Sequence, residues 1–239
     1  MGRFATLLAV ACLGALGLAG TASPHIALAD TPRAASPRAE SPAFLVARPR
    51  VTSLSLRSRP GGSLVGRLGR RTQFGSEVTL AVVRRRGAWL SVVTTALPNG
   101  RLAWVRARDV RISHTRISLT LDLSRRALFL KRGDRVLRRM RVGVGRPGSP
   151  TPTGRFAVTD KLSGSAYGSY YGCCIVALSA HQPNLPPGWR GGDRIAVHGT
   201  NQPSTIGAAA SAGCPHARDA DLRVLMARVP LGAPVFIQA

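Results

Sequence analysis

Two short segments near the C-terminal end carry the residue types needed for covalent chemistry. Segment 195–200 reads IAVHGT and segment 211–216 reads SAGCPH. Cysteine attacks carbonyl groups as the thiolate, and a neighbouring imidazole favours that form. Fifteen residues separate His198 from Cys214, enough for a loop to fold back and bring the two together. The pattern predicts Cys214 as a nucleophile and His198 as its general base and acid.

Glycines flank both candidate residues. Gly213 precedes the cysteine, and a residue without a side chain lets the backbone approach a substrate carbonyl closely. The amides of Gly213 and Cys214 are therefore expected to form an oxyanion pocket. Gly199 follows His198. We expect His198 at the end of a short strand, where a substrate can reach its side chain most easily.

A metal site and a purely structural role remain open as alternatives. His181, His198, Cys214 and His216 are all possible zinc ligands. Only Cys214 and His216 have the close spacing of a structural zinc site. A single cysteine and a single histidine are also commonly packed in a core, so these residues alone do not decide the chemistry.

The N-terminus predicts export. A short basic start is followed by an apolar run from about residue 4 to residue 20 and by Ala27-Leu-Ala29, so residues 1–29 are expected to be a signal peptide. Its uncleaved form would be a membrane anchor, and lipidation of Cys12 is a second alternative. No later segment is apolar enough to span a bilayer. The expected location is the cell wall or periplasm.

Removal of the signal peptide would leave three cysteines, Cys173, Cys174 and Cys214. An odd number means that at least one thiol is free or pairs between chains, which again indicates Cys214. The adjacent Cys173 and Cys174 allow a vicinal disulfide, a shield for the active thiol or a pair of small apolar residues. Their apolar neighbours favour the last interpretation, in a buried strand.

Charge is the dominant feature of the composition. Lys and Arg total 34 against 10 Asp and Glu, a formal net charge of +24, and nearly all the basic residues are arginine. The electric field of this net positive charge attracts polyanions. The arginines are spread along the chain and not gathered in one recognition stretch, so anionic cell-wall polymers or a membrane surface are the expected partners and nucleic acid is not. Codon bias alone is the alternative explanation.

The pattern after the leader is mainly β, with 26 glycines and 17 prolines and few aromatic residues. Residues 30–42 are rich in Pro, Ala, Ser and Arg and are expected to be a flexible linker. Five short strands broken by turns are expected in residues 43–112, which predicts a small barrel. The motifs at 56–62 (LRSRPGG), Gly87-Ala-Trp89 and Trp104-Val105 make this segment resemble a bacterial SH3-like domain, which implies wall binding or a spacer role.

The second half predicts a β-sandwich-like domain with little helix over residues 115–239. Residues 117–123 alternate as a half-buried strand, and residues 127–130 and 136–144 predict a hairpin across a turn at 131–134. Further strands are expected at 155–159, 195–197 and 235–237. Apolar residues from Leu222 to Val229 have helical spacing, and Pro230 ends that helix.

From about residue 117 onward the chain resembles the L,D-transpeptidase catalytic domain of the YkuD family. The resemblance rests on LTLDLS at 119–124, VGRPGSPTPTG at 144–154, AVHGT at 196–200 and SAGC at 211–214. It implies that Cys214 is the nucleophile, His198 the base, Gly213 part of the oxyanion site, and Ser211 and Thr200 part of the pocket. Members act on peptidoglycan stem peptides through a thioester, form 3→3 cross-links and require neither a metal nor an organic cofactor.

Three positions depart from the family pattern. Ala212 stands where the family has His, Asn or a similar polar residue, His216 where it commonly has Arg or Asn, and Pro215 is unusual beside the nucleophile. His216 is expected to replace a lost charge or to act on the thiolate as a second imidazole. These departures leave three functions to separate: an acyl-transferring enzyme, a catalytically degenerate wall-binding structural protein, and a metallohydrolase.

Overall fold

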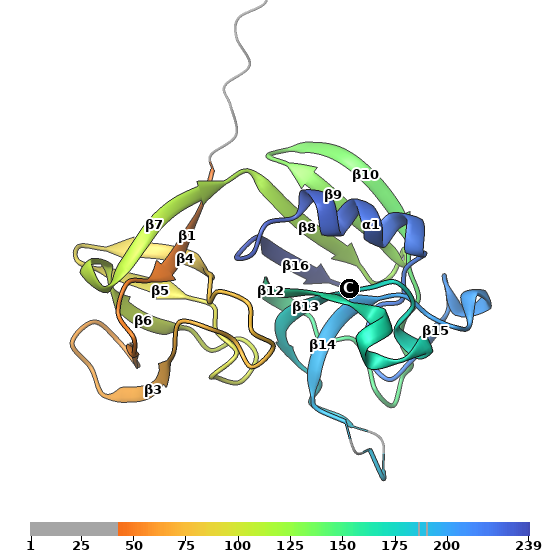
Figure 1. Ribbon diagram of the computed structural model, residues 1–239, viewed down its shortest axis with the longest axis horizontal. Helices are drawn as coiled ribbons and strands as arrows, with labels where there is room; N and C mark the ends of the chain where they lie inside the picture. The colour runs from red at the N-terminus through yellow and green to blue at the C-terminus, as the bar shows by residue number, and fades with distance from the viewer. Residues whose placement is uncertain (1–42, 186, 190) are drawn as a thin grey trace, which may run out of the picture. The chain divides into compact units, whose positions relative to one another are not determined.

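The computed structural model describes residues 43–185, 187–189 and 191–239 (Figure 1). The predicted signal peptide at 1–29 and linker at 30–42 lie outside the described residues. Within the described residues, no helix has the length and apolar character needed to cross a membrane. The fold is mainly β, as the sequence predicts, with sixteen strands and a single α-helix in the described part of the chain.

The first seven strands form one antiparallel sheet in the order β3-β2-β6-β5-β4-β1-β7. Its core is formed by apolar residues that alternate along the strands, among them Leu54, Leu56, Leu90 and Val105. The expected five strands were too few, because β1 and β3 were not predicted; β3 is largely exposed and lacks a clear alternation of apolar residues. The strands are β1 (Phe44–Pro49), β2 (Leu54–Arg57), β3 (Leu64–Leu68), β4 (Leu80–Arg86), β5 (Trp89–Val92), β6 (Ala103–Arg106) and β7 (Val110–Thr115).

The remaining chain builds a second seven-stranded sheet in the order β10-β9-β8-β16-β12-β13-β14. The predicted hairpin is confirmed, since β9 and β10 pair antiparallel. The predicted strands at 117–123, 195–197 and 235–237 are also confirmed. The elements are β8 (Ile117–Asp122), β9 (Ala127–Arg132), β10 (Arg135–Arg141), β12 (Gly154–Ser163), β13 (Cys174–His181), β14 (Arg194–His198) and β16 (Pro234–Gln238).

The long strand β12 gives this region its sandwich-like form. Its first residues, Gly154 to Ala157, pair with β16, and its later residues pair with β13, with a register irregularity between Val158 and Asp160. One core cluster joins both halves of the sheet, with Leu119 and Leu128 from one half and Leu178 and Ile195 from the other. The expected sandwich-like sheet is therefore present.

A single α-helix, α1 (Asp219–Arg228), closes this core. Leu222 and Leu225 are fully buried in the same cluster as the sheet residues. The helix ends before Pro230, as predicted, because proline cannot continue the hydrogen-bond ladder. A two-stranded parallel pair, β11 (Val144–Gly145) with β15 (Ala209–Ser211), holds the loop that leads to Cys214. Short 3-10 turns are η1 (Ala107–Asp109), η2 (Gly164–Tyr167), η3 (Ser169–Tyr171) and η4 (Pro203–Thr205).

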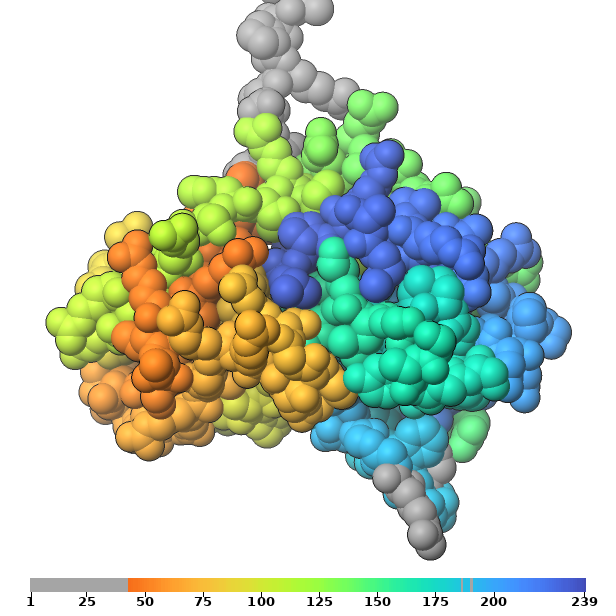
Figure 2. All heavy atoms as spheres, in the orientation of Figure 1, coloured from red at the N-terminus to blue at the C-terminus, as the bar shows by residue number. Residues whose placement is uncertain are grey.

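Hydrogen bonds join the regions of the two sheets at several points. Thr72, in the turn after β3, donates its hydroxyl to the Asp160 carboxylate in β12. Asn99 exchanges two hydrogen bonds with the backbone of His181, donating Nδ2–H to its carbonyl oxygen (2.7 Å) and accepting its amide at Oδ1 (2.9 Å). In Figure 2 the amber segment after β3 lies against the teal segment of the second sheet region.

Candidate active site

The outer edge of β14 holds the segment that carries Cys214. The Ala196 amide donates a hydrogen bond to Cys214 Sγ (3.4 Å), and the His198 amide donates to the Pro215 carbonyl (3.1 Å). The Ala217 amide in turn donates to the His198 carbonyl (2.9 Å). The chain after Cys214 thus adds to the edge strand in parallel, and backbone pairing brings segments 195–200 and 211–216 together.

His198 is buried and held in one tautomer. Its side chain lies at the end of β14, and the residue is 1% exposed. Nδ1 lies 2.6 Å from the Gly199 carbonyl oxygen, which accepts hydrogen bonds only, so Nδ1 carries the proton and Nε2 keeps a lone pair. Burial, and then repulsion from His216, lower the pKa of His198 to about 4, while the Gly199 hydrogen bond opposes the shift. The imidazole is therefore neutral at pH 7 and has the lone pair that a general base needs.

Cys214 is the free cysteine of the described residues. Burial raises the pKa of its thiol to about 11, against the opposing effect of the Ala196 hydrogen bond. The thiol is therefore protonated, and it donates to the Arg194 carbonyl (3.8 Å). Among the described residues, no hydrogen bond joins the sulfur to His198. The resting pair is a neutral thiol and a neutral imidazole.

Both side chains line one cavity of about 250 Å³. Its wall is largely aromatic and aliphatic. Phe74 contacts Tyr167 edge-on with ring centroids 6.3 Å apart, Tyr167 contacts Tyr171 at 6.2 Å, and Tyr171 lies 4.9 Å from the His198 ring. Phe74 belongs to the turn after β3, so the N-terminal sheet region contributes to the wall of the same cavity as Cys214.

Gly213 occupies a position that only glycine fits. Its φ of +123° lies in the region that favours glycine, and a Cβ there would overlap the Gln182 side-chain amide. Its amide donates to Ser211 Oγ (3.1 Å), and its carbonyl accepts from Thr151 Oγ1 (2.7 Å). The Gly213 amide is therefore already engaged, whereas the Cys214 amide has no acceptor within the described part of the chain.

Of the other predicted pocket residues, Gly199 lies beside the base and Thr200 lies further along the loop. The Gly199 amide donates to the Cys174 carbonyl (3.3 Å), and a Cβ at Gly199 would come within 2.6 Å of the Gly172 Cα. Thr200 uses its hydroxyl to accept the Gln202 amide (3.0 Å). Close backbone packing thus explains Gly199, while Thr200 shapes the loop.

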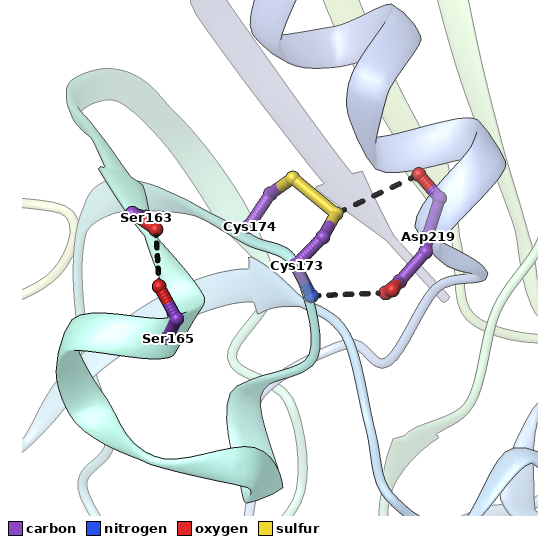
Figure 3. The surroundings of a disulfide bond; sticks show 5 residues. All are labelled: Ser163, Ser165, Cys173, Cys174 and Asp219. Carbon is purple, nitrogen blue, oxygen red and sulfur yellow. Dashed lines mark hydrogen bonds between the residues drawn. A yellow bond between two sulfur atoms is a disulfide. The ribbon is translucent and has the colours of Figure 1, made fainter.

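Cys173 and Cys174 form a vicinal disulfide (Figure 3). Cys174 is buried at the start of β13, as the sequence predicts, but the two sulfurs are bonded and are not a free apolar pair. The Cys173 amide donates to Asp219 Oδ1 at the start of α1 (3.1 Å). The disulfide thus lies between α1 and the Tyr171–Gly172 turn that packs on His198 and Gly199.

His216 lies directly behind the base. Its ring centroid is 4.7 Å from that of His198 and 5.9 Å from that of Tyr170. Both ring nitrogens are buried and lack a hydrogen-bond partner in the described residues. Burial lowers the pKa of His216, so this imidazole is also neutral at pH 7.

The four possible zinc ligands do not assemble into one site. Within the described ranges, no group of three or more His, Cys, Asp or Glu residues is placed to hold a metal ion. His181 instead pairs with Asp193 through Nδ1 (2.8 Å) and donates from Nε2 to the Thr95 carbonyl (2.9 Å).

Several residues of the site were not identified from the sequence. Gln182 donates Nε2–H to the carbonyls of Pro150 (3.1 Å) and Ala212 (2.9 Å), which ties the loop before Cys214 to the loop before β12. Tyr170 and Tyr171 cover the His198 ring. No local pattern marks Gln182, whereas the tyrosines stand out as an aromatic pair in a chain with few aromatic residues.

Comparison with known proteins agrees with the motifs. Residues 116–237 match the model of the YkuD family, described as the L,D-transpeptidase catalytic domain. Over 121 residues the chain is 30% identical to a YkuD protein of Bacillus licheniformis and 28% identical to one of Bacillus subtilis. Each match spans 50% of this chain and 64% of the relative.

Solved structures give weaker likenesses. An L,D-transpeptidase from Mycobacterium smegmatis is 14% identical, with a TM-score of 0.43, and the match covers 83% of this chain and all of that one. L,D-transpeptidase 3 from Mycobacterium tuberculosis is 17% identical, with a TM-score of 0.41 over 58% of this chain and 74% of that one. These scores establish neither the fold nor the function. The family match, which covers about half of the sequence, does establish membership: this chain belongs to the YkuD family of L,D-transpeptidase catalytic domains.

Proposed function

We propose that the protein is an L,D-transpeptidase that acts on peptidoglycan stem peptides, with Cys214 as nucleophile and His198 as general base and acid. The observation that carries the proposal is the backbone pairing that joins the segment after Cys214 to the edge strand β14, so that Cys214 and His198 line one cavity. The family match supports the proposed substrate class, and the free lone pair of His198 beside the Cys214 thiol supports the proposed roles of base and nucleophile.

The first half-reaction forms a thioester. His198 Nε2 takes the proton of the Cys214 thiol, and the sulfur attacks the carbonyl carbon of the amide between the diamino acid and D-Ala. The tetrahedral intermediate collapses as protonated His198 gives its proton to the departing amine of D-Ala. The oxyanion is stabilised by the Cys214 amide, because the Gly213 amide is engaged by Ser211.

The second half-reaction releases the enzyme. A side-chain amine of another stem attacks the thioester carbonyl while His198 accepts its proton, which forms the 3→3 amide. The sulfur leaves and regains the proton from His198. The resting geometry requires one movement beforehand, because the thiol donates to the Arg194 carbonyl and must turn towards His198.

A neutral thiol in the resting state is consistent with this sequence of steps. A pKa of about 11 means that the thiolate is scarce at pH 7, so His198 has to take the thiol proton during the reaction. The tautomer held by Gly199 keeps the accepting nitrogen of His198 free for that step. Neither half-reaction uses a metal or an organic cofactor.

The other parts of the chain have proposed roles of their own. We assign residues 43–112 to an SH3-like targeting module and residues 115–239 to the catalytic domain. Export through cleavage after residue 29 would place both in the cell wall or periplasm. Covalent acyl transfer remains the function that this arrangement of Cys214 and His198 supports best.

Mass spectrometry with a soluble stem tetrapeptide tests the proposal. The wild type is expected to release D-Ala and to carry a thioester adduct on Cys214 that adds the mass of the tripeptide less one water. Cys214→Ala should abolish both signals, and His198→Gln should slow D-Ala release by about 10²- to 10⁴-fold. If the wild type neither released D-Ala nor carried an adduct, the proposed transpeptidase activity would be refuted.

A catalytically degenerate wall-binding protein is the second candidate. The observations that favour it are the cavity wall at Ala212, where the family has a polar side chain, and the missing hydrogen bond between Cys214 and His198 among the described residues. This alternative predicts that purified wall retains the wild type and Cys214→Ala equally and that neither turns over stem peptide. Turnover by the wild type alone would exclude it.

A further inference from the structure

A concave surface on the N-terminal sheet region gathers five arginines. We call it the arginine groove; it has a volume of about 650 Å³ and shares no residue with the cavity of Cys214. Arg48 lies in β1, Arg50 directly follows it, Arg111 lies in β7, and Arg70 and Arg71 lie in the loop after β3. All five side chains belong to exposed residues.

The groove carries more positive charge than its own residues neutralise. Glu77 is the single acidic residue among those that line it, which leaves a formal surplus of four positive charges. Arg48 pairs with Glu77 (3.4 Å), and Arg71 donates to the Gly75 carbonyl (2.7 Å). The guanidinium groups of Arg50, Arg70 and Arg111 have no hydrogen-bond or ion-pair partner in the described part of the chain.

Strand pairing forces two of these charges together. The register of β1 and β7 places Arg48 directly opposite Arg111. Like charges at opposed positions of neighbouring strands destabilise a sheet. Glu77 offsets the charge of Arg48, whereas Arg111 has no acidic partner among the described residues, so an anion bound between the two arginines would lower their repulsion further.

The chemistry of the groove selects its ligand. Guanidinium groups bind phosphate oxygens through paired hydrogen bonds, and three of them are free here. A volume of about 650 Å³ exceeds what one phosphate fills, which favours several linked phosphates. The family places the chain among proteins with cell-wall chemistry. We propose that the arginine groove binds a phosphodiester polymer of the cell wall, of the polyol phosphate kind.

Binding of poly(glycerol phosphate) to three forms of the protein tests this. The groove variant is Arg50→Ala/Arg70→Ala/Arg111→Ala. The matched control is Arg67→Ala/Arg86→Ala/Arg101→Ala, which removes the same charge from exposed positions of the same region outside the groove. We expect the groove variant to lose about tenfold or more in affinity, with a shallower dependence of affinity on salt because fewer counterions are released. The control should change by less than about threefold.

Three outcomes would overturn the proposal. Equal losses in both variants would show that net charge alone governs binding, and no binding by the wild type would remove the site. Tighter binding of a DNA duplex through the same three arginines would reassign the ligand. Melting temperatures in the absence of polymer show whether the variants are folded, and the polymer should raise that of the wild type more than that of the groove variant.

The result is separable from the proposed acyl transfer. D-Ala release from a soluble stem tetrapeptide should be the same in the groove variant and the wild type, because no arginine of the groove lines the cavity. Loss of polymer binding with unchanged D-Ala release supports the groove. Loss of D-Ala release in the groove variant, with its melting temperature unchanged, would overturn the proposal of a separate polymer site.

Discussion

The ring of His216 lies 4.7 Å from the ring of His198, and neither nitrogen of His216 has a hydrogen-bond partner among the described residues. A buried polar atom without a partner costs roughly 1–3 kcal/mol of folding free energy. The neighbouring imidazole also disfavours the protonated form of His198. His216 therefore lowers the pKa of His198 and at the same time lowers the folding stability of the protein.

Replacement of His216 by Phe is expected to separate these two effects. Loss of the unpaired nitrogens should raise the unfolding free energy by about 1–3 kcal/mol. Loss of the neighbouring imidazole should raise the pKa of His198, so the acidic limb of kcat/KM should move to higher pH. Calorimetry measures the change in stability, and a pH–rate profile measures the shift of the acidic limb. His114→Phe, at an exposed position of β7, is the control and should change neither. An unchanged acidic limb in His216→Phe would contradict the proposed influence of His216.

The pH dependence of Cys214 alkylation should reveal a neutral resting thiol. A raised pKa means that the thiolate is scarce below pH 11, so the rate of reaction with iodoacetamide should rise about tenfold per pH unit from 7 to 10. Cys214→Ala gives the background, because Cys173 and Cys174 are bonded to each other. A rate that is already constant near pH 7 would instead indicate a thiolate–imidazolium pair.

Gly213→Ala should damage the site through the backbone. Alanine would have to adopt a φ of +123° and place its Cβ against Gln182, at a cost of roughly 2–4 kcal/mol in stability. D-Ala release should fall at least tenfold, because Cys214 follows directly. Gly148→Ala is the control, since a Cβ there meets no atom within 4 Å. Equal effects of the two substitutions would show that the Gly213 backbone has no special role.

Phe74 is expected to affect substrate binding more than catalysis. Thr72 Oγ1 fixes its turn by bonding to Asp160 and by accepting the amides of Phe74 and Ser76 (each 3.2 Å). Phe74→Ala should raise KM for a stem tetrapeptide about fivefold to tenfold, equivalent to about 1–1.4 kcal/mol, and leave kcat within about twofold.

Asn99→Ala is the matched control for Phe74→Ala. It removes a different contact between the two sheet regions, and Asn99 does not line the cavity. Its KM should stay near that of the wild type while the melting temperature falls. If Asn99→Ala raised KM as much as Phe74→Ala, the effect would come from docking of the two regions and not from the cavity wall.

Local patterns in the sequence were sufficient for much of the fold. Alternation of apolar and polar residues predicted β8, and an apolar pattern around a turn predicted the β9–β10 hairpin, because strand formation depends on neighbours in the chain. Helical spacing before Pro230 predicted α1. The motifs around His198 and Cys214 were enough to suggest the family. Edge strands such as β3 escaped prediction, since an exposed strand has little apolar pattern.

Only the tertiary structure decided how the candidate site is arranged. Backbone pairing on the edge of β14 joins Cys214 to His198 across sixteen positions of sequence, and burial sets both groups neutral. The disulfide of Cys173 with Cys174 and the approach of Phe74 to the cavity likewise depend on packing. Hydrogen-bond direction, desolvation and distance arise between segments that are remote in the chain. For that reason the residue types could be named from the sequence, but their protonation and partners could not.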